Sequence, residues 1–204
     1  KLSGTFTFPE GDARFPAVVL ISGSGPQDRN EEIFGHKPFW VLADALTRKG
    51  IAVLRFDDRG THASGGTFPT ASTFDFARDA EAAVSYLLSR EEVNSRRIGL
   101  AGHSEGGIIA PIVAGRNKKV SFIVLMAGTS MRGDQLLLKQ SELIQRASGI
   151  SEKDIERSSE INRGLYDLVI RSGDTGDTGQ LMEKFLREKL VSMPESDKPS
   201  GMTG

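Results

Sequence analysis

The chain has 204 residues, of which 38% are hydrophobic and 26% are charged, and its formal net charge is −1. This composition is typical of a globular protein with one domain, or with one domain and an insertion. The small net charge gives no indication of a nucleic-acid surface, and no stretch approaches the roughly 18 apolar residues of a membrane span. The absence of cysteine excludes thiolate catalysis but suits cytoplasm and periplasm alike, so the compartment stays open. The oligomeric state cannot be read from the sequence.

In the first part of the chain, short apolar runs alternate with helical patterns. The apolar run at 17–21, for example, is typical of a strand that is covered on both faces, and the helix expected at 73–90 has Ala77, Ala80 and Val84 on one stripe. This alternation predicts an α/β fold, with a mostly parallel sheet and helices on both faces. Strands are expected at residues 2–8, 17–21, 51–56, 97–101 and 120–126, and helices at residues 37–49, 73–90 and 104–115.

The pattern changes after Ala127, because residues from about 131 to 193 are helical in pattern and contain no strand run. Ser151 begins a capping pattern, residues 172–176 are typical of a loop, and residues 194–201 are polar and linker-like. A helical block that follows a strand of an α/β sheet is interpreted as a lid insertion over the active site, the alternative being a few extra surface helices. The sequence therefore predicts an α/β core at residues 1–130 and a helical lid, or cap, at residues 131–204.

The most informative motif is the run Gly102-His103-Ser104-Glu105-Gly106-Gly107, which directly follows an apolar stretch. The pattern G-x-S-x-G between a strand and a helix is typical of a nucleophile elbow, in which a sharp turn exposes the serine. Flanking glycines fit this turn, because a nearby Cβ would clash with the strained backbone. Ser104 is therefore the candidate nucleophile, whereas the simpler alternative is an ordinary strand-to-helix turn with an incidental serine.

A nucleophilic serine also needs donors for the oxyanion that develops during attack. The backbone N–H of Glu105 lies at the start of the following helix, and a second N–H is expected from the small residues Ser22–Gly25. This loop, the loop at 57–66 and the elbow all follow strands, so they should meet at one edge of the sheet. The glycine-rich loop could instead hold phosphate, but no Lys-Ser or Lys-Thr pair follows it at P-loop spacing.

The histidines do not supply an obvious base, since His36, His62 and His103 all precede Ser104. In enzymes whose serine lies on a nucleophile elbow, the acid and the histidine follow the serine along the chain. His103 is expected to point along the elbow, His62 lies in a loop that could reach the site, and His36 is interpreted as a turn residue. The three histidines show no metal-ligand spacing.

Asp134 could be an acid after the next strand, but no downstream histidine is available for it to orient. We therefore expect that the acid, the histidine and the last strands of the sheet are missing from this chain, and that the protein continues beyond Gly204.

Three segments carry a resemblance to bacterial α/β-hydrolase-fold esterases, namely Leu20–Arg29, Arg55–Gly60 and Gly102–Gly107. The similarity is to the EstD-like carboxylesterases, which are related to the serine aminopeptidase and dienelactone-hydrolase groups. It implies an α/β-hydrolase fold and places Ser22-Gly23-Ser24 where many relatives carry His-Gly-x, so that Ser24 supplies the second oxyanion N–H. The run Asp57–Ser64 resembles the family's D-x-R-G-x-G-x-S loop, with His62 in place of a glycine. In this family the lid follows the strand after the elbow, and the acid and histidine come later.

These observations predict a serine hydrolase that cleaves carboxylic esters through an acyl-enzyme on Ser104, with Ser24 and Glu105 as backbone donors. The expected partner is a small acyl ester, with no nucleic acid, no membrane span, no cofactor and no metal. A peptidase, amidase or thioesterase on the same scaffold remains open, because leaving-group preference depends on the lid and the pocket. A non-catalytic module of the same fold that binds an acyl ligand or a protein partner also remains open.

Overall fold

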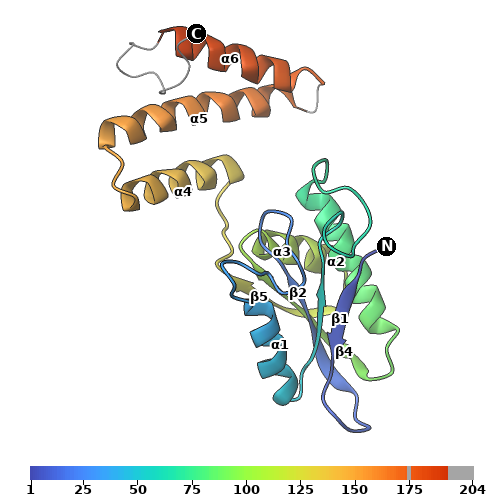
Figure 1. Ribbon diagram of the computed structural model, residues 1–204. Coiled ribbons are helices and arrows are strands. Elements are labelled where there is room, and N and C mark those ends of the chain that lie inside the picture. Colours follow the sequence, from blue (N-terminus) through green and yellow to red (C-terminus); the bar gives the residue numbers. More distant parts are fainter. Residues whose placement is uncertain (174–175, 193–204) are drawn as a thin grey trace. The chain divides into compact units, whose positions relative to one another are not determined.

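The computed structural model describes residues 1–173 and 176–192, in two compact units that are Lys1–Ser130 and Met131–Gly204 (Figure 1). The polar linker predicted at residues 194–201 lies outside the described residues. The elements of the first unit, in chain order, are β1 (Gly4–Thr7), β2 (Phe15–Ile21), α1 (Pro38–Arg48), β3 (Ala52–Phe56), α2 (Thr73–Leu88), β4 (Val93–His103), α3 (Gly106–Arg116) and β5 (Val120–Met126).

The first unit is built on one mostly parallel sheet. In the described part of the chain the strand order is β1-β3-β2-β4-β5, and β1 alone pairs antiparallel to its neighbour. The central strand β2 is buried from Ala17 to Ile21, as its continuous apolar run predicts. At one edge of the sheet, the side chains Phe122 to Leu125 of β5 are between 37% and 49% exposed.

Helices cover both faces of this sheet, as the sequence predicts. On β2, Val19 and Ile21 belong to a core that also contains Val84 of α2 and Ile109 of α3. The alternate residues of β2 pack instead with Phe39 and Ala43 of α1 in a second, smaller core. This alternation follows from strand geometry, in which successive side chains point to opposite faces.

Local signals define the helix ends. Helix α1 begins at Pro38, where a missing backbone N–H costs nothing, and the chain turns away at Gly50 with a φ of +87°. Helix α2 begins after Ser72, which forms a capping box with Asp75. The expected end of α2 at residue 90 is wrong by two residues, because the helix stops at Leu88.

Two predicted boundaries around the elbow are also wrong. Strand β4 runs from Val93 to His103 instead of 97–101. Its first half contains exposed polar residues at 95–97, so it lacks the apolar run that indicates a buried strand. Helix α3 begins at Gly106 rather than at residue 104, since the two preceding residues form a tight turn.

The second unit consists of α4 (Gly133–Ala147), α5 (Glu152–Ser172) and α6 (Thr178–Ser192), and α5 packs against both of the others. Ser151 caps α5, because its Oγ accepts a hydrogen bond from the Asp154 backbone N–H at 3.2 Å. Ile155 is buried, whereas many apolar side chains of the three helices are exposed. Within residues 1–173 and 176–192, no helix combines the length and apolar character needed to cross a membrane.

Candidate active site

Ser104 lies in the tight turn between β4 and α3. Its φ is +52°, in the left-handed region that costs most L-residues about 1–2 kcal/mol. Two backbone hydrogen bonds of 2.9 Å hold the turn, from the Ser104 N–H to the Met126 carbonyl and from the Gly107 N–H to the Ser104 carbonyl. A strained conformation that its surroundings enforce in this way is typical of a functional position.

Close backbone approaches explain the glycines on either side of this serine. A Cβ on Gly102 would lie 1.9 Å from the Gly106 carbonyl oxygen, and a Cβ on Gly106 would lie 2.2 Å from the Ile21 carbonyl oxygen. Both distances are far below van der Waals contact, and the obstructing atoms belong to the backbone. The spacing G-x-S-x-G therefore reflects a physical requirement of this turn.

The loop after β2 lies directly beside the elbow, as predicted. A Cβ on Gly23 would lie 3.2 Å from the Ser104 Cβ. The Gly23 N–H donates to the Glu31 carboxylate at 2.7 Å, so it is not available to a substrate. Among the described residues, by contrast, the backbone N–H groups of Ser24 and Glu105 and the Ser104 hydroxyl have no hydrogen-bond partner.

Asp58, two residues after the end of β3, holds both ends of this loop. It accepts hydrogen bonds from the Ser22 hydroxyl at 2.9 Å and from the Gln27 backbone N–H at 3.0 Å. Burial raises the pKa of the Asp58 carboxyl to about 6, although these two hydrogen bonds oppose the shift, and the nearby carboxylates of Asp79 and Glu105 add to it. The buried carboxyl thus fixes the loop at both of its ends.

Asp57 fixes the next part of the same loop. Its carboxylate is 2% exposed and accepts from the Arg29 backbone N–H, from two nitrogens of the Arg29 guanidinium at 2.9 and 2.6 Å, and from the Ala63 N–H. Burial alone would raise the pKa of Asp57, but the hydrogen bonds from Arg29 and Ala63 outweigh it and hold the pKa below its usual value.

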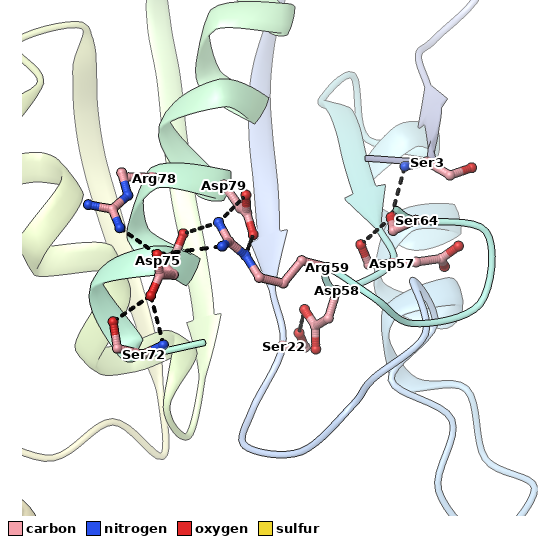
Figure 2. Close-up of polar contacts among 10 residues, drawn as sticks. All are labelled: Ser3, Ser22, Asp57, Asp58, Arg59, Ser64, Ser72, Asp75, Arg78 and Asp79. Atoms are coloured by element: carbon pink, nitrogen blue, oxygen red, sulfur yellow. Dashed lines mark hydrogen bonds and ion pairs between the residues drawn. The ribbon is translucent and has the colours of Figure 1, made fainter. Parts of the chain in front are cut away.

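The loop after β3, at residues 57–66, is hydrogen-bonded to α2 and to the N-terminal segment. Figure 2 shows Arg59 reaching Asp79 of α2, where the distance from Nε to the carboxylate is 2.6 Å, and Ser64 bridging the Asp57 carbonyl and the Ser3 N–H. His62 has a φ of +46°, in the left-handed region that favours glycine. All three predicted loops therefore meet at one edge of the sheet.

Glu31 is a residue of this site that the sequence analysis missed. One of its carboxylate oxygens lies 2.7 Å from the Gly23 N–H and also 2.7 Å from Nδ1 of His103. The adjacent pair of glutamates in the sequence is typical of a solvated turn, and no local pattern distinguishes the buried member from its exposed neighbour. Glu31 and His103 are 72 positions apart in the sequence, so their contact arises only from the fold.

Within residues 1–173 and 176–192, no histidine is hydrogen-bonded to the nucleophile. His103 is bound to Glu31, and His36 and His62 are exposed loop residues. In the part of the chain described here, none of the three forms a hydrogen bond with Ser104. Asp134 lies in the second unit and pairs with Arg132.

A narrow cavity of about 10 Å³, the room for one water molecule, lies beneath the loop. It is lined by the polar residues Ser22, Asp58 and Glu105 and by apolar side chains that include Phe56 and Phe76. The Glu105 carboxylate accepts a hydrogen bond from the Thr73 hydroxyl of α2 at 2.8 Å. Thr73 thereby ties the turn after Ser104 to α2.

Comparison with known proteins identifies the family of this chain. The sequence profile of the serine aminopeptidase (S33) family matches residues 38–162, which include the elbow. Esterase EstD from Thermotoga maritima is 35% identical over 161 residues, which cover 74% of this chain. The chain spans 37% of the length of EstD.

Solved structures show the same fold at lower identity. The α/β hydrolase GrgF from Penicillium sp. sh18 matches with a TM-score of 0.52 at 19% identity, covering 91% of this chain and 73% of GrgF. XC6422 from Xanthomonas campestris is described as an α/β serine hydrolase without a lid. It matches with a TM-score of 0.50 at 22% identity, and the match covers 64% of this chain and 57% of the XC6422 chain. With its strained serine turn and its mostly parallel sheet, this chain is an α/β hydrolase of the serine aminopeptidase (S33) family, similar to EstD.

Proposed function

We propose that this protein is a serine hydrolase that cleaves carboxylic esters through an acyl-enzyme on Ser104. One observation carries the proposal: the strained turn sets Ser104 beside a loop, and the backbone N–H groups of Ser24 and Glu105 have no partner among the described residues. Similarity to a relative named as an esterase supports the choice of ester substrates.

In the proposed reaction, Ser104 Oγ attacks the ester carbonyl carbon, and the carbonyl oxygen becomes an oxyanion. The N–H groups of Ser24 and Glu105 donate to this oxyanion, and the N-terminal end of α3 adds a favourable dipole. Loss of the alcohol leaves an acyl-serine, which water then hydrolyses. Removal of one such donor typically costs about 3 kcal/mol of transition-state stabilisation.

Ser104 also requires a general base. Because no histidine described here bonds to Ser104, we propose that the histidine and the acid that orients it lie outside these 204 residues, consistent with the 37% of EstD that the chain spans. The base would take the Ser104 proton during attack and return it to the leaving alcohol.

The proposal is tested by the hydrolysis of short p-nitrophenyl esters by the full natural protein. Ser104→Ala should abolish turnover and keep the fold, whereas Ser85→Ala, on the exposed side of α2, should retain full activity. Ser24→Pro removes one donor and should lower kcat by about 10²–10³-fold. Undiminished turnover in Ser104→Ala would refute the assignment.

Amide bonds are the second candidate substrates, because the matching family is described as serine aminopeptidases. An amide leaving group needs more help from the general acid, but the nucleophile and the oxyanion donors serve both reactions. Matched esters and anilides with one acyl group separate the two. The proposed esterase should have the higher kcat/KM for the ester and little turnover of the anilide.

We propose that residues 131–204 act as the lid of the enzyme. The unit follows β5 directly, and it exposes apolar side chains such as Leu143 and Ile144, which are 52% and 57% exposed. Replacing both residues with serine should raise KM for p-nitrophenyl esters of longer acyl chains more than for p-nitrophenyl acetate. Equal kinetics for all chain lengths would contradict a role as a lid.

A further inference from the structure

We infer that Glu31 is a positioning residue that locks the loop carrying the Ser24 N–H against the Ser104 turn, an inference that rests on the proposed function. One oxygen of the Glu31 carboxylate accepts from the Gly23 N–H and contacts His103 Nδ1, each at 2.7 Å. Gly23 directly precedes Ser24, and His103 directly precedes Ser104. A single buried oxygen therefore joins the two chain segments whose alignment the reaction needs.

The surroundings of Glu31 favour a strong and rigid contact. The residue is 6% exposed, and hydrogen bonds to an ionised acceptor at such distances are roughly twice as strong as neutral ones. His103 donates from Nδ1 to the carboxylate, while the Gly23 N–H approaches the same oxygen. A Cβ on Gly23 would lie 3.3 Å from that oxygen and 3.4 Å from Nδ1, so the three groups are closely packed.

The backbone at Glu31 is itself constrained. Its φ is +52°, in the region where glycine or asparagine is the usual choice, and its N–H donates to the Asp28 carbonyl at 2.9 Å. The preceding residue is fixed as well, because the Asn30 carbonyl accepts from the Phe39 N–H and the Asn30 side chain accepts from Arg55. The carboxylate is thus presented from a segment with little freedom to move.

This arrangement has a kinetic consequence. Once the Gly23 N–H is engaged by Glu31, the next N–H along the chain, that of Ser24, is left for the oxyanion. Loss of the carboxylate would release the Gly23 peptide and let the Ser24 N–H move away from its working position. Since the oxyanion exists only in the transition state and the tetrahedral intermediate, the loss should appear in kcat and not in KM.

The test compares Glu31→Ala, Glu31→Gln and Glu32→Ala in the full natural protein, with a p-nitrophenyl ester as substrate. Alanine at position 31 bears the same left-handed strain as glutamate, so the change isolates the carboxylate. We expect a fall in kcat of about 10- to 100-fold in Glu31→Ala with KM within about 3-fold. Glu31→Gln should recover most of the activity, because its amide oxygen can still accept from Gly23. Glu32 is exposed and pairs with Lys37 at the surface, so Glu32→Ala should match the wild type.

Amide hydrogen exchange supplies a second readout, independent of turnover. Glu31→Ala should accelerate exchange at Gly23 and leave the core of β2 and β4 protected. The inference is overturned if Glu31→Ala behaves like Glu32→Ala, or if its loss of activity comes with faster exchange throughout β2 and β4. If the wild type itself turns over no ester, the proposed function fails and this inference falls with it. An active wild type beside a fully active Glu31→Ala refutes the inference alone.

Discussion

Replacing Asp57 should destabilise the first unit strongly. The Asp57 carboxylate is 2% exposed, and it accepts two hydrogen bonds from the Arg29 guanidinium and one each from the Arg29 and Ala63 backbone N–H groups. Removing one partner of a buried ion pair typically costs about 3–5 kcal/mol. Because the Arg29 side chain is 23% exposed and also donates to Thr5 and Ser3, we expect the lower end, about 3 kcal/mol.

Urea denaturation of the wild type and Asp57→Asn at pH 7 measures this cost, and Asp44→Ala is the matched control. Asp44 also pairs with an arginine, Arg48, but on the exposed surface of α1, so its loss should have no measurable effect. The pKa of Asp57 is lowered in the folded state, so its contribution is present above about pH 4 and is lost as the pH falls. A change below about 1 kcal/mol at pH 7, or a difference that grows on acidification, would refute the reasoning.

Three further predictions concern single positions. Gly106→Ala should abolish folding to an active form, since its Cβ would lie 2.2 Å from a backbone oxygen, whereas Gly115→Ala has open space and should raise stability by about 0.5–1 kcal/mol; thermal unfolding compares the two. His62→Gly relieves the strain of a φ of +46°, which offsets the entropy that glycine adds to the unfolded chain, so the free energy of unfolding in urea should fall by no more than about 0.5 kcal/mol; a larger fall would contradict this reasoning. The pKa of Asp58 is raised to about 6, so the wild type should lose about 2 kcal/mol relative to Asp58→Asn as the pH rises from 4 to 7; a constant difference would contradict the raised pKa.

The regular elements of the first unit follow from local patterns in the sequence. Strand β5 was predicted with its observed bounds, Val120–Met126, because its apolar run ends sharply on both sides. The apolar stripe of α2 was correct too, since Ala77 and Val84 are fully buried. Strand β4 was only half predicted, because its polar first half is exposed and gives no apolar signal.

The candidate site divides in the same way. The elbow could be predicted because its requirement is local: two backbone approaches exclude a Cβ at Gly102 and Gly106, and this leaves a mark in the sequence. The contacts that hold the neighbouring loop join residues far apart in the chain. Asp58 meets Ser22 across 36 positions, and Glu31 meets His103 across 72. A single sequence contains no spacing rule for such pairs, so these roles required the fold.

The central claim is that Ser104 is the nucleophile of a hydrolase. A fluorophosphonate probe reacts covalently with an activated serine, so intact-mass spectrometry and peptide mapping of the full natural protein test the claim directly. We predict one label per chain, located on the peptide that contains Ser104, and no label in Ser104→Ala. An unlabelled wild type, or a label that persists in Ser104→Ala, would contradict the assignment.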